Sequence, residues 1–467
     1  MKRQPHFLDS FFNPASIAVV GASRNPLKIS HNLLANLIKL QFAGRVYPIN
    51  PGVPDLMGLK AYPNLQAVED EIDLVICGVP ATSALDVIKD CVEKRVKSVV
   101  VVAGGFSEAG QDGKKLQTEI ARLLKENGIR AIGPNSLSPI NSRYNLAIGF
   151  SPHEILTQGG ASFIFQSGLY EPRLNWLLLN FHLGINKLID LGNKMDVNEV
   201  EALEYLGDDP ETKVIAMHLE SVEGDGRAFF QTLKEISRRK PVVVLKSGRT
   251  PAAAKAASSH TGVIARGSDA VFDSALRQAG AIRAQTIEEF FDFAKAFECF
   301  TPLKLNGNRI VIAAYPGGEG VITTDECQLH GLSLADVSPE TYDKVQTIAP
   351  PWTINPNPFD LGVSTQFNGP RKVYKILMEA MTEDDNVDCL AIEIELSAME
   401  SPDLILEPFL MAREKKKPLA VWPMESTRQD MTPVEWLESH KIPVYPSGER
   451  AVKSLAAVHR YSTNNLQ

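Results

Sequence analysis

The sequence lacks the cysteine spacing of a disulfide framework or a structural zinc site. Its five cysteines include no CxxC pair and are scattered along 467 residues, at Cys77, Cys91, Cys299, Cys327 and Cys389. An odd, dispersed set is typical of proteins in a reducing compartment. The sequence therefore predicts neither cross-links nor a metal site.

Long apolar runs are also missing. No stretch approaches the roughly 20 apolar residues that a membrane-spanning helix needs. The N-terminal segment Met1–Ser16 has two basic residues, Lys2 and Arg3, but no apolar core of signal-peptide length. These absences predict a cytoplasmic protein with no membrane partner.

The sequence has no excess of basic residues. Its 48 lysines and arginines are outnumbered by 56 acidic residues, which gives a formal net charge of −8. Because nucleic acids recruit basic surfaces, the charge predicts no nucleic-acid partner. A local anion site remains open, since backbone N–H groups bind phosphate without net positive charge.

What the sequence does have is a regular alternation of short β-branched runs with amphipathic stretches, which predicts parallel βαβ units. We expect an α/β protein of three consecutive Rossmann-like or flavodoxin-like doubly wound domains, at 1–150, 151–300 and 309–467, with 301–308 as a linker. The strands are predicted at Ser16–Gly21, Arg45–Ile49, Asp73–Gly78, Lys97–Ala103, Ala161–Phe165, Lys187–Leu191, Lys213–Leu219, Pro241–Lys246, Arg309–Ala314, Val387–Ile394 and Pro418–Pro423.

A small-residue turn follows the first predicted strand. It reads Gly21-Ala22-Ser23, with Lys28 shortly before a helix. Small residues let the backbone approach a pyrophosphate, although a single glycine is not the full GxGxxG pattern. A small residue at a βα turn of a Rossmann-like sheet is an equally good structural explanation.

The ends of the next three strands converge on the same edge of the predicted sheet. They carry Asn50-Pro51, Val79-Pro80 and Gly104-Gly105-Phe106-Ser107-Glu108. Ligands of doubly wound sheets bind at these ends, so a nucleotide-type crevice is expected. No acidic residue follows the second strand to hold a ribose, which counts against a dinucleotide dehydrogenase.

Two further candidates lie in the second segment. Ser167-Gly168 follows a strand and predicts a helix cap that could hold a phosphate. His260 lies in a run rich in glycine, serine and threonine, and we expect a loop carrying a nucleophilic imidazole. Glu220, at the end of a strand, could fix the tautomer of that imidazole; Glu223 is an alternative that the spacing does not exclude.

The ordered motifs resemble the α subunit of ADP-forming (NDP-forming) acyl-CoA synthetases, relatives of succinyl-CoA synthetase. They read VVGAS, YPINP, CGVP, AGGFSE, IGPNS, QSG, LGNKMDV, DDPETKVI, LESV, LKSGRT and SSHTG. The third segment contributes Gly317–Gly320 and Asn357–Leu361. The resemblance covers nearly the whole chain, and SSHTG with DDPETKVI is its most specific part.

The resemblance implies a role for each candidate. His260 would carry the phosphoryl group, Glu220 would orient it, and Asn135, Ser167 and Gly168 would form the phosphate and substrate site. The first domain would bind CoA, the second would have the succinyl-CoA synthetase-like flavodoxin fold, and the third would be a ligase-associated domain. The CoA-binding residues would be Gly21, Ala22, Ser23, Lys28, Asn50, Pro51, Val79, Pro80, Gly104, Gly105, Phe106, Ser107 and Glu108.

The family reaction interconverts acyl-CoA, ADP and phosphate with a carboxylic acid, CoA and ATP, through an acyl phosphate and a phosphohistidine. No ATP-grasp domain is evident in the sequence, so the resemblance implies an ATP-grasp β subunit that holds ADP or ATP with Mg²⁺. A small carboxylic acid would be the other substrate.

Some positions depart from the family pattern. They include Tyr170 and Glu171 where small residues are usual, and Gly52 in place of a lysine; the others are Ser136, Ser138, Glu319 and Arg266. These departures leave a non-catalytic CoA- or acyl-CoA-binding regulator as an alternative. A Rossmann oxidoreductase is a weaker one, for want of the acidic ribose partner.

Overall fold

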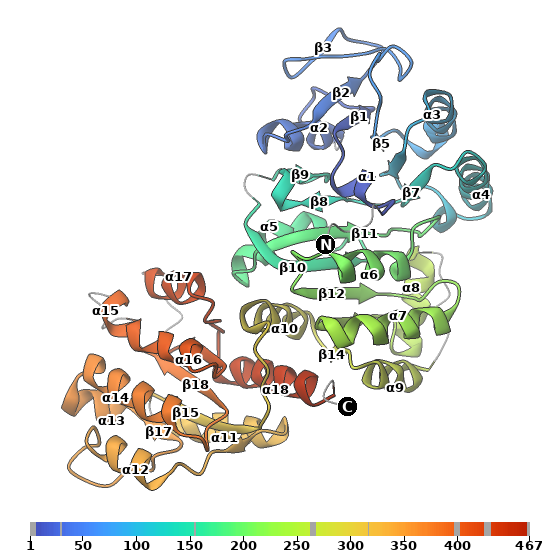
Figure 1. The fold of residues 1–467 in the computed structure, drawn as a ribbon. Coiled ribbons are helices and arrows are strands. Elements are labelled where there is room, and N and C mark those ends of the chain that lie inside the picture. Colours follow the sequence, from blue (N-terminus) through green and yellow to red (C-terminus); the bar gives the residue numbers. More distant parts are fainter. Residues whose placement is uncertain are drawn as a thin grey trace. The chain divides into compact units, whose positions relative to one another are not determined.

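Three mainly parallel β-sheets with helices between their strands form most of the described chain (Figure 1). The computed structural model describes residues 6–28, 30–153, 156–261, 268–315, 317–396, 402–424 and 431–464, with only the backbone given for 257–261 and 402. These residues form two compact units, 1–285 and 286–467. The predicted α/β class is confirmed.

The first sheet has the order β2-β1-β5-β6-β7 and is parallel throughout. All residues of β1, β5 and β6 are buried, as expected for β-branched runs covered on both faces. The strands are β1 (Ser16–Val20), β2 (Arg45–Ile49), β5 (Leu74–Cys77), β6 (Ser98–Val101) and β7 (Arg130–Ile132); the connecting helices are α2 (Ser30–Lys39), α3 (Ala81–Lys94), η1 (Ser107–Ala109) and α4 (Gln111–Glu126), after an N-terminal α1 (Asp9–Phe12).

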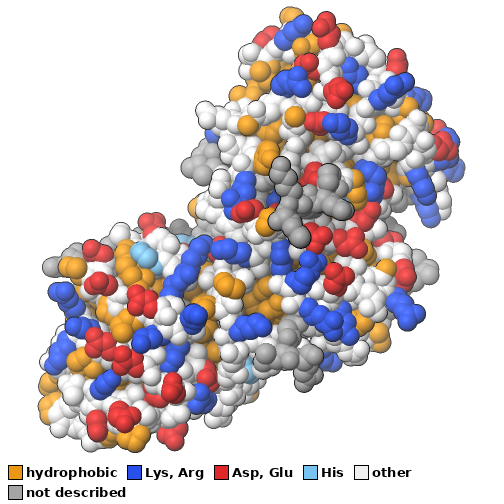
Figure 2. All heavy atoms as spheres, viewed as in Figure 1, with side chains coloured by type: hydrophobic (Ala, Val, Ile, Leu, Met, Phe, Trp, Pro, Cys, Tyr) orange, Lys and Arg blue, Asp and Glu red, His pale blue; other side chains and the backbone are white. Residues whose placement is uncertain are grey.

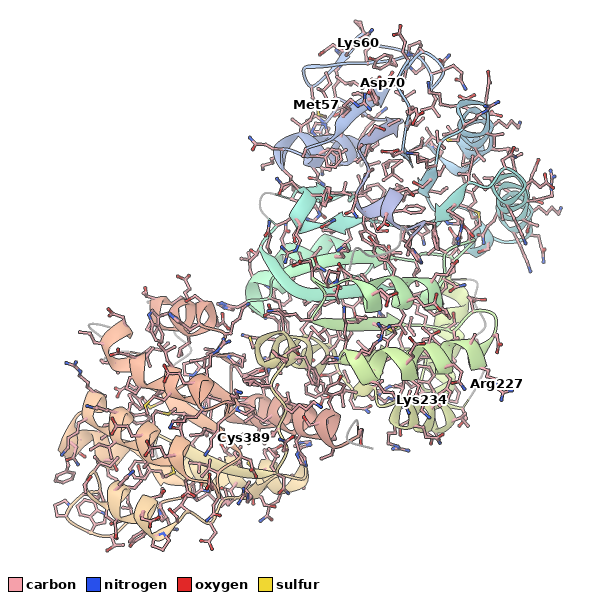
Figure 3. The ribbon with its side chains drawn as sticks, in the orientation of Figure 1. Met57, Lys60, Asp70, Arg227, Lys234 and Cys389 are labelled. Atoms are coloured by element: carbon pink, nitrogen blue, oxygen red, sulfur yellow. The ribbon has the colours of Figure 1, made fainter. Side chains whose placement is uncertain are left out.

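A small hairpin, β3 (Asp55–Leu56) and β4 (Leu59–Lys60), follows β2 in the first unit. Met57 and Lys60 mark it in Figure 3. Among the described strands it pairs only within itself, and its turn residue Gly58 has a φ of +81°.

The second sheet, in the same unit, has the order β14-β13-β12-β10-β11-β8-β9. Its first five strands are parallel, whereas β8 and β9 are antiparallel. The elements are β8 (Ile140–Asn141), η2 (Ser142–Tyr144), β9 (Leu146–Ala147), β10 (Gln158–Phe165), η3 (Glu171–Arg173), α5 (Leu174–Asn180), β11 (Ile185–Asp190), α6 (Glu199–Asp208), β12 (Val214–Leu219), α7 (Gly226–Arg239), β13 (Val242–Lys246), α8 (Pro251–Thr261), α9 (Asp269–Ala279) and β14 (Ile282–Ala284).

Residues 140–147 belong to the second sheet, although they lie within the predicted first domain. Asn141 pairs with Lys187 of β11, and the Ser142 hydroxyl donates to the Ile185 carbonyl over 2.6 Å. One hydrophobic cluster also joins the two sheets, and in it Phe12 stacks on Tyr205 with ring centroids 5.1 Å apart. The two sheets therefore share buried side chains within one unit.

The second unit contains the third sheet, of order β16-β15-β18-β19 with β17 beside β15, all parallel. Helix α10 (Ile287–Phe300) packs on α18 (Gly448–Asn464), where Arg450 pairs with Asp292 at 2.6 Å. The other elements are β15 (Arg309–Ala314), α11 (Gly317–Leu329), β16 (Ser333–Leu334), α12 (Pro339–Gln346), β17 (Phe359–Asp360), α13 (Leu361–Asn368), α14 (Pro370–Glu383), β18 (Cys389–Ile394), α15 (Pro402–Leu406), η4 (Glu407–Phe409), α16 (Leu410–Glu414), β19 (Leu419–Pro423) and α17 (Thr432–Ser439).

Helix α10 thus lies in the second compact unit, although its residues belong to the predicted second domain, 151–300, before the predicted linker 301–308. The two units divide at 285, and the division into three domains stays a prediction. The difference has a physical reason, because α10 packs on α18 of the later unit.

The described surface and the cysteines show no special site. Basic and acidic side chains are interspersed on the face shown in Figure 2. All five cysteines are buried thiols, with Cys389 inside β18 (Figure 3). Among the described residues, no helix combines the length and apolarity needed to cross a bilayer, and no cluster of metal-ligating side chains occurs.

Candidate functional site

The Gly21 turn is shaped by close backbone approach at the carboxyl edge of the first sheet. Gly21 follows β1 with a φ of +85°, a conformation that costs a side chain free energy. A Cβ here would lie 2.9 Å from Cγ1 of Val79 and 3.1 Å from the Gly78 carbonyl oxygen. Position 21 therefore requires glycine for both conformational and steric reasons.

Asn50 ties the turn after β2 to the turn after β1. Its amide donates to the Ala22 carbonyl over 3.0 Å, and its side-chain oxygen accepts from the Gly52 N–H at 2.8 Å. The Ser23 hydroxyl accepts from the Asn25 N–H, while Lys28 and Pro51 are exposed. Pro80 is the N-cap residue of α3 on the neighbouring strand β5. The structure thus brings these predicted residues to one edge.

Glu108 organises the turn after β6. Its Oε1 accepts the N–H groups of Gly105 and Phe106 at 2.6 and 3.2 Å, and Asn193 donates to its Oε2 over 2.6 Å. Burial raises the pKa of Glu108, but these hydrogen bonds outweigh it and the net pKa is lowered. Glu108 is thus held as a carboxylate by donors of its own loop and by Asn193, and it positions the Gly104–Glu108 turn.

Asn135 completes this edge from β7. It follows the Gly133-Pro134 bond with a φ of +59°, and its N–H donates to the Ala103 carbonyl at 3.0 Å. A Cβ on Gly104 would lie 3.5 Å from the Asn135 side-chain oxygen. Gly192 packs against the Pro134 and Asn135 carbonyls so closely that only glycine fits. The first crevice therefore touches the second sheet within the same unit.

Gln166 clamps the Glu220 turn at the carboxyl edge of the second sheet. Its Oε1 accepts the N–H groups of Glu220 and Ser221, each at 2.9 Å, and its Nε2 donates to the Ser221 hydroxyl over 2.9 Å. β10 and β12 are neighbours, with Phe165 beside His218. Sequence patterns gave no role to Gln166, although its place between a buried strand and the Ser-Gly turn was a usable signal.

Two lysines, one with a buried side chain and one half-buried, hold the same turn. Lys194 Nζ donates to the Ser221 carbonyl and pairs with Glu199, both at 2.8 Å, with side chains 1% and 0% exposed. Lys246 Nζ donates to the Glu220 carbonyl over 2.8 Å. Burial lowers the pKa of both lysines. Neither was predicted, because pairs so distant in sequence leave no local pattern.

Ser167 does not cap a helix, so that prediction is wrong. Its hydroxyl accepts the Leu169 N–H at 3.3 Å, and α5 begins only at Leu174. Tyr170 stacks on Phe165 with ring centroids 4.1 Å apart, and the 3₁₀ turn Glu171–Arg173 precedes the helix. Ser167 and Gly168 instead form an open turn after β10.

His260 lies in helix α8, where a loop was expected. Alanine-rich sequence from Pro251 favours the helix, which continues to Thr261. The side chain of His260 lies outside the described part of the structure, as does Arg266. α8 packs beside η1, which forms part of the Gly104–Glu108 turn. Helix α8 is thereby brought to the edge that carries the first crevice.

A small pocket opens beside Ser167 and Gly168. It has room for about one water molecule, and its other lining residues are Leu137, Ile140, Phe165, Glu171, Leu174, Leu188 and Asp190. Asp190 Oδ2 accepts from the Leu137 N–H at 3.0 Å and Oδ1 from the Gly192 N–H at 3.2 Å. Burial raises the pKa of Asp190 to about 7, assisted by Glu171 and Glu220 and opposed by these two hydrogen bonds.

Asp190→Asn is expected to remove a pH dependence of stability. Folded Asp190 keeps its proton up to about pH 7, whereas the unfolded chain releases it near the ordinary value of 3.8. The wild type therefore loses stability as pH rises from about 4 to 7. Melting temperatures across this range should fall a few degrees more in the wild type than in D190N. Exposed Asp112→Asn is the control; equal slopes in D190N and the wild type would contradict the assignment.

Known proteins resemble the chain along its length. A family model described as a CoA binding domain matches residues 15–141, and one described as a succinyl-CoA ligase like flavodoxin domain matches 158–297. Acetate–CoA ligase [ADP-forming] I subunit alpha of Pyrococcus furiosus is 34% identical over 97% of this chain and 98% of its own.

Two further relatives extend the comparison. Acetate–CoA ligase [ADP-forming] II of Archaeoglobus fulgidus is 34% identical over 98% of this chain, which covers 68% of that longer protein. The structure of dinucleotide forming acetyl-coenzyme A synthetase 1 of Ca. Korarchaeum cryptofilum, in complex with phosphate and ADP, superposes with a TM-score of 0.88. It is 34% identical and covers 98% of this chain and 97% of that one.

Proposed function

This chain belongs to the family of ADP-forming acyl-CoA synthetases, and on that premise we propose how its residues divide the reaction. The chain is of the α-subunit type, and the reaction interconverts acyl-CoA, ADP and phosphate with a carboxylic acid, CoA and ATP. The observation that carries the proposal is the placement of the Glu220 turn, the Ser167-Gly168 turn and the backbone of α8 in one unit. Its five unlinked cysteines support a reducing, cytoplasmic setting.

CoA would be held at the carboxyl edge of the first sheet. Three features suit a phosphate-bearing ligand. Gly21 has no side chain, so a phosphate can come close to the backbone; Asn50 is hydrogen-bonded to Ala22; and Lys28 is exposed. Bound CoA would supply a thiolate that attacks the acyl carbonyl. The remaining contacts would come from Ala22, Ser23, Pro51, Val79, Pro80, Gly104, Gly105, Phe106 and Ser107, with Glu108 holding the last turn in place.

His260 would carry the phosphoryl group. An imidazole nitrogen forms an N–P bond with the acyl phosphate, the bond from phosphorus to the acyl oxygen breaks, and the carboxylate leaves. Ser167, Gly168 and Asn135 would hold the phosphate. Glu220 would accept a hydrogen bond from the other imidazole nitrogen and fix its tautomer. The support for Glu220 is its position directly after β12, where Gln166 and Lys246 fix its backbone.

The phosphoryl group would then pass to ADP on an ATP-grasp β subunit. A longer single-chain relative and relatives named as α subunits support a partner polypeptide. Mg²⁺ would accompany the nucleotide on that partner, since the described residues of this chain offer no cluster of metal-ligating side chains.

Turnover with the partner tests the proposal. The chain and its ATP-grasp partner should form a CoA thioester from a short carboxylic acid, ATP and CoA, with release of ADP. Formation of AMP instead, or no thioester from any acid in a broad panel, would contradict it. The second outcome would favour the non-catalytic CoA-binding regulator, to which the Glu171 and Gly52 departures point.

Gly21→Ala should weaken CoA binding by at least about tenfold. The new Cβ meets Val79 and must also adopt a φ of +85°, so the turn has to move. Gly58→Ala is the matched control, because its φ is +81° but nothing lies within 4 Å of its added Cβ. Calorimetric titration with CoA measures both. Equal affinities for the two variants would remove Gly21 from the CoA site.

A further inference from the structure

The segment between β12 and α7 is held in place by side chains from other parts of the second sheet. It contains no helix or strand, so its N–H and C=O groups need partners elsewhere. Gln166 accepts the N–H groups of Glu220 and Ser221, each at 2.9 Å. Lys246 and Lys194 donate to the carbonyl groups of the same two residues, each over 2.8 Å. Three side chains that are distant in sequence therefore fix the backbone at the start of this segment.

Gln166 differs from the two lysines in its place in the chain. It directly follows β10 and directly precedes Ser167, at the edge where β12 lies beside β10 (Figure 1). Its own N–H donates to the His218 carbonyl at 3.2 Å, which extends the contact between the two strands. Gln166 is only 3% exposed. One buried residue thus joins the Ser167-Gly168 turn to the Glu220 turn.

The amide of Gln166 uses both of its polar atoms on the Glu220 turn. Its Oε1 has two acceptor positions for the two N–H groups, and its Nε2 donates to the Ser221 hydroxyl over 2.9 Å. A hydrocarbon side chain of the same length would leave both N–H groups of this largely buried turn without an acceptor. The backbone would have to move to find water, and the Glu220 carboxyl group would move with it.

Small displacements of an orienting group have large effects on a reaction. A misplacement of about 1 Å can lower a rate by about a hundredfold. In the proposed function Glu220 fixes the tautomer of the His260 imidazole, so its backbone has to be placed accurately during phosphoryl transfer. The same proposal assigns CoA to the first sheet and the nucleotide to the partner, so neither of these binding steps depends on Gln166.

We propose that Gln166 is a positioning residue for phosphoryl transfer between the acyl phosphate and His260, and that it acts through Glu220. This inference rests on the proposed function and adds no group to the reacting atoms. It assigns Gln166 to the transfer that takes place on this chain and not to the transfer that takes place at the nucleotide of the partner.

Gln166→Met, which keeps the length of the side chain but removes the amide, tests the proposal in the chain with its ATP-grasp partner. Labelled ATP with Mg²⁺ should load phosphate onto Q166M as onto the wild type. Discharge of this label to inorganic phosphate, by CoA together with each acid of the broad panel, should be about a hundredfold slower. Gln166→Glu should stay within about tenfold of the wild type, because a carboxylate accepts the same two N–H groups.

Gln66→Met is the matched control, since the exposed Gln66 makes one hydrogen bond, to the Asp90 carbonyl at 3.1 Å. Its label should be discharged at the wild-type rate. Calorimetric titration with CoA shows whether each variant is folded. If Q166M does not bind CoA, Gln166→Asn takes its place, because its amide is withdrawn by one methylene group and should slow the same step.

A double-mutant cycle separates a positioning role from a general loss of stability. In a Glu220→Ala background, Gln166→Met should slow the discharge by less than about twofold more, because the group that it positions is gone. A further hundredfold loss in that background, or discharge by Q166M at the wild-type rate, would overturn this inference alone. A wild type whose label is discharged by no acid of the panel would overturn the proposed function as well.

Discussion

His260→Ala should lower the turnover of acid, ATP and CoA by a factor on the order of 10⁴ or more, since removing a covalent nucleophile leaves no alternative acceptor for the phosphoryl group. Labelled ATP with Mg²⁺ and the ATP-grasp partner should place an acid-labile phosphate on the wild type and none on H260A. CoA affinity should stay unchanged, because the proposed CoA contacts lie on the first sheet. The measurement therefore separates binding from phosphoryl transfer.

His330→Ala is the control for this experiment. His330 directly follows α11 in the second unit, and its Nε2 lies 3.4 Å from the Glu326 carboxylate. The His330→Ala variant should carry the same acid-labile phosphate label as the wild type. Equal labelling of H260A, or turnover within tenfold of the wild type, would show that phosphate is carried elsewhere or passes directly to the nucleotide.

Lys194→Met should destabilise the first unit by about 3–5 kcal/mol, because it leaves the buried Glu199 without its cation. The two side chains are 1% and 0% exposed and 2.8 Å apart. Lys194 also donates to Ser221, so the variant should lower activity through the Glu220 turn. Urea unfolding measures the stability and steady-state turnover the activity.

Two comparisons make this prediction specific. Lys115→Met removes an ion pair with Asp112 whose side chains are 78% and 98% exposed, and it should leave unfolding almost unchanged. Combining Lys194→Met with Glu199→Leu should recover part of the loss, since the uncompensated charge is then gone. If the Lys194→Met protein were as stable as the Lys115→Met protein, the Lys194–Glu199 ion pair would not stabilise the first unit.

Strand positions were largely predictable from sequence. Arg45–Ile49 and Arg309–Ala314 are strands with the predicted bounds, because short apolar runs that contain valine and isoleucine are typical of strands in parallel sheets. Two-residue strands such as β8 and β17 were not predicted, since so short a segment has no periodicity. Their pairing is set by tertiary contacts.

The residues of the candidate site were predictable where they lie in turns that follow strands. They were less predictable where their hydrogen-bond partners are far away in the sequence. Gly21 and Asn50 follow strands in the sequence and meet at one edge of the sheet, as expected. Gln166 holds residues 54 and 55 positions away, a separation that no local pattern reports. The helix predicted at Ser167 failed because Tyr170 is buried against Phe165, a packing preference that overrides capping chemistry.

The short strands β8 and β9 have a consequence for how this protein emerges from a ribosome. Both are synthesised before β11, the strand that pairs with β8. The backbone N–H and C=O groups of β8 that face β11 therefore stay unpaired until β11 has been synthesised. A fragment ending near residue 150 would keep that unmatched edge permanently, and its complement would expose the β11 side of the second sheet. Unpaired edges recruit other chains, so severed halves should aggregate where the continuous polypeptide does not.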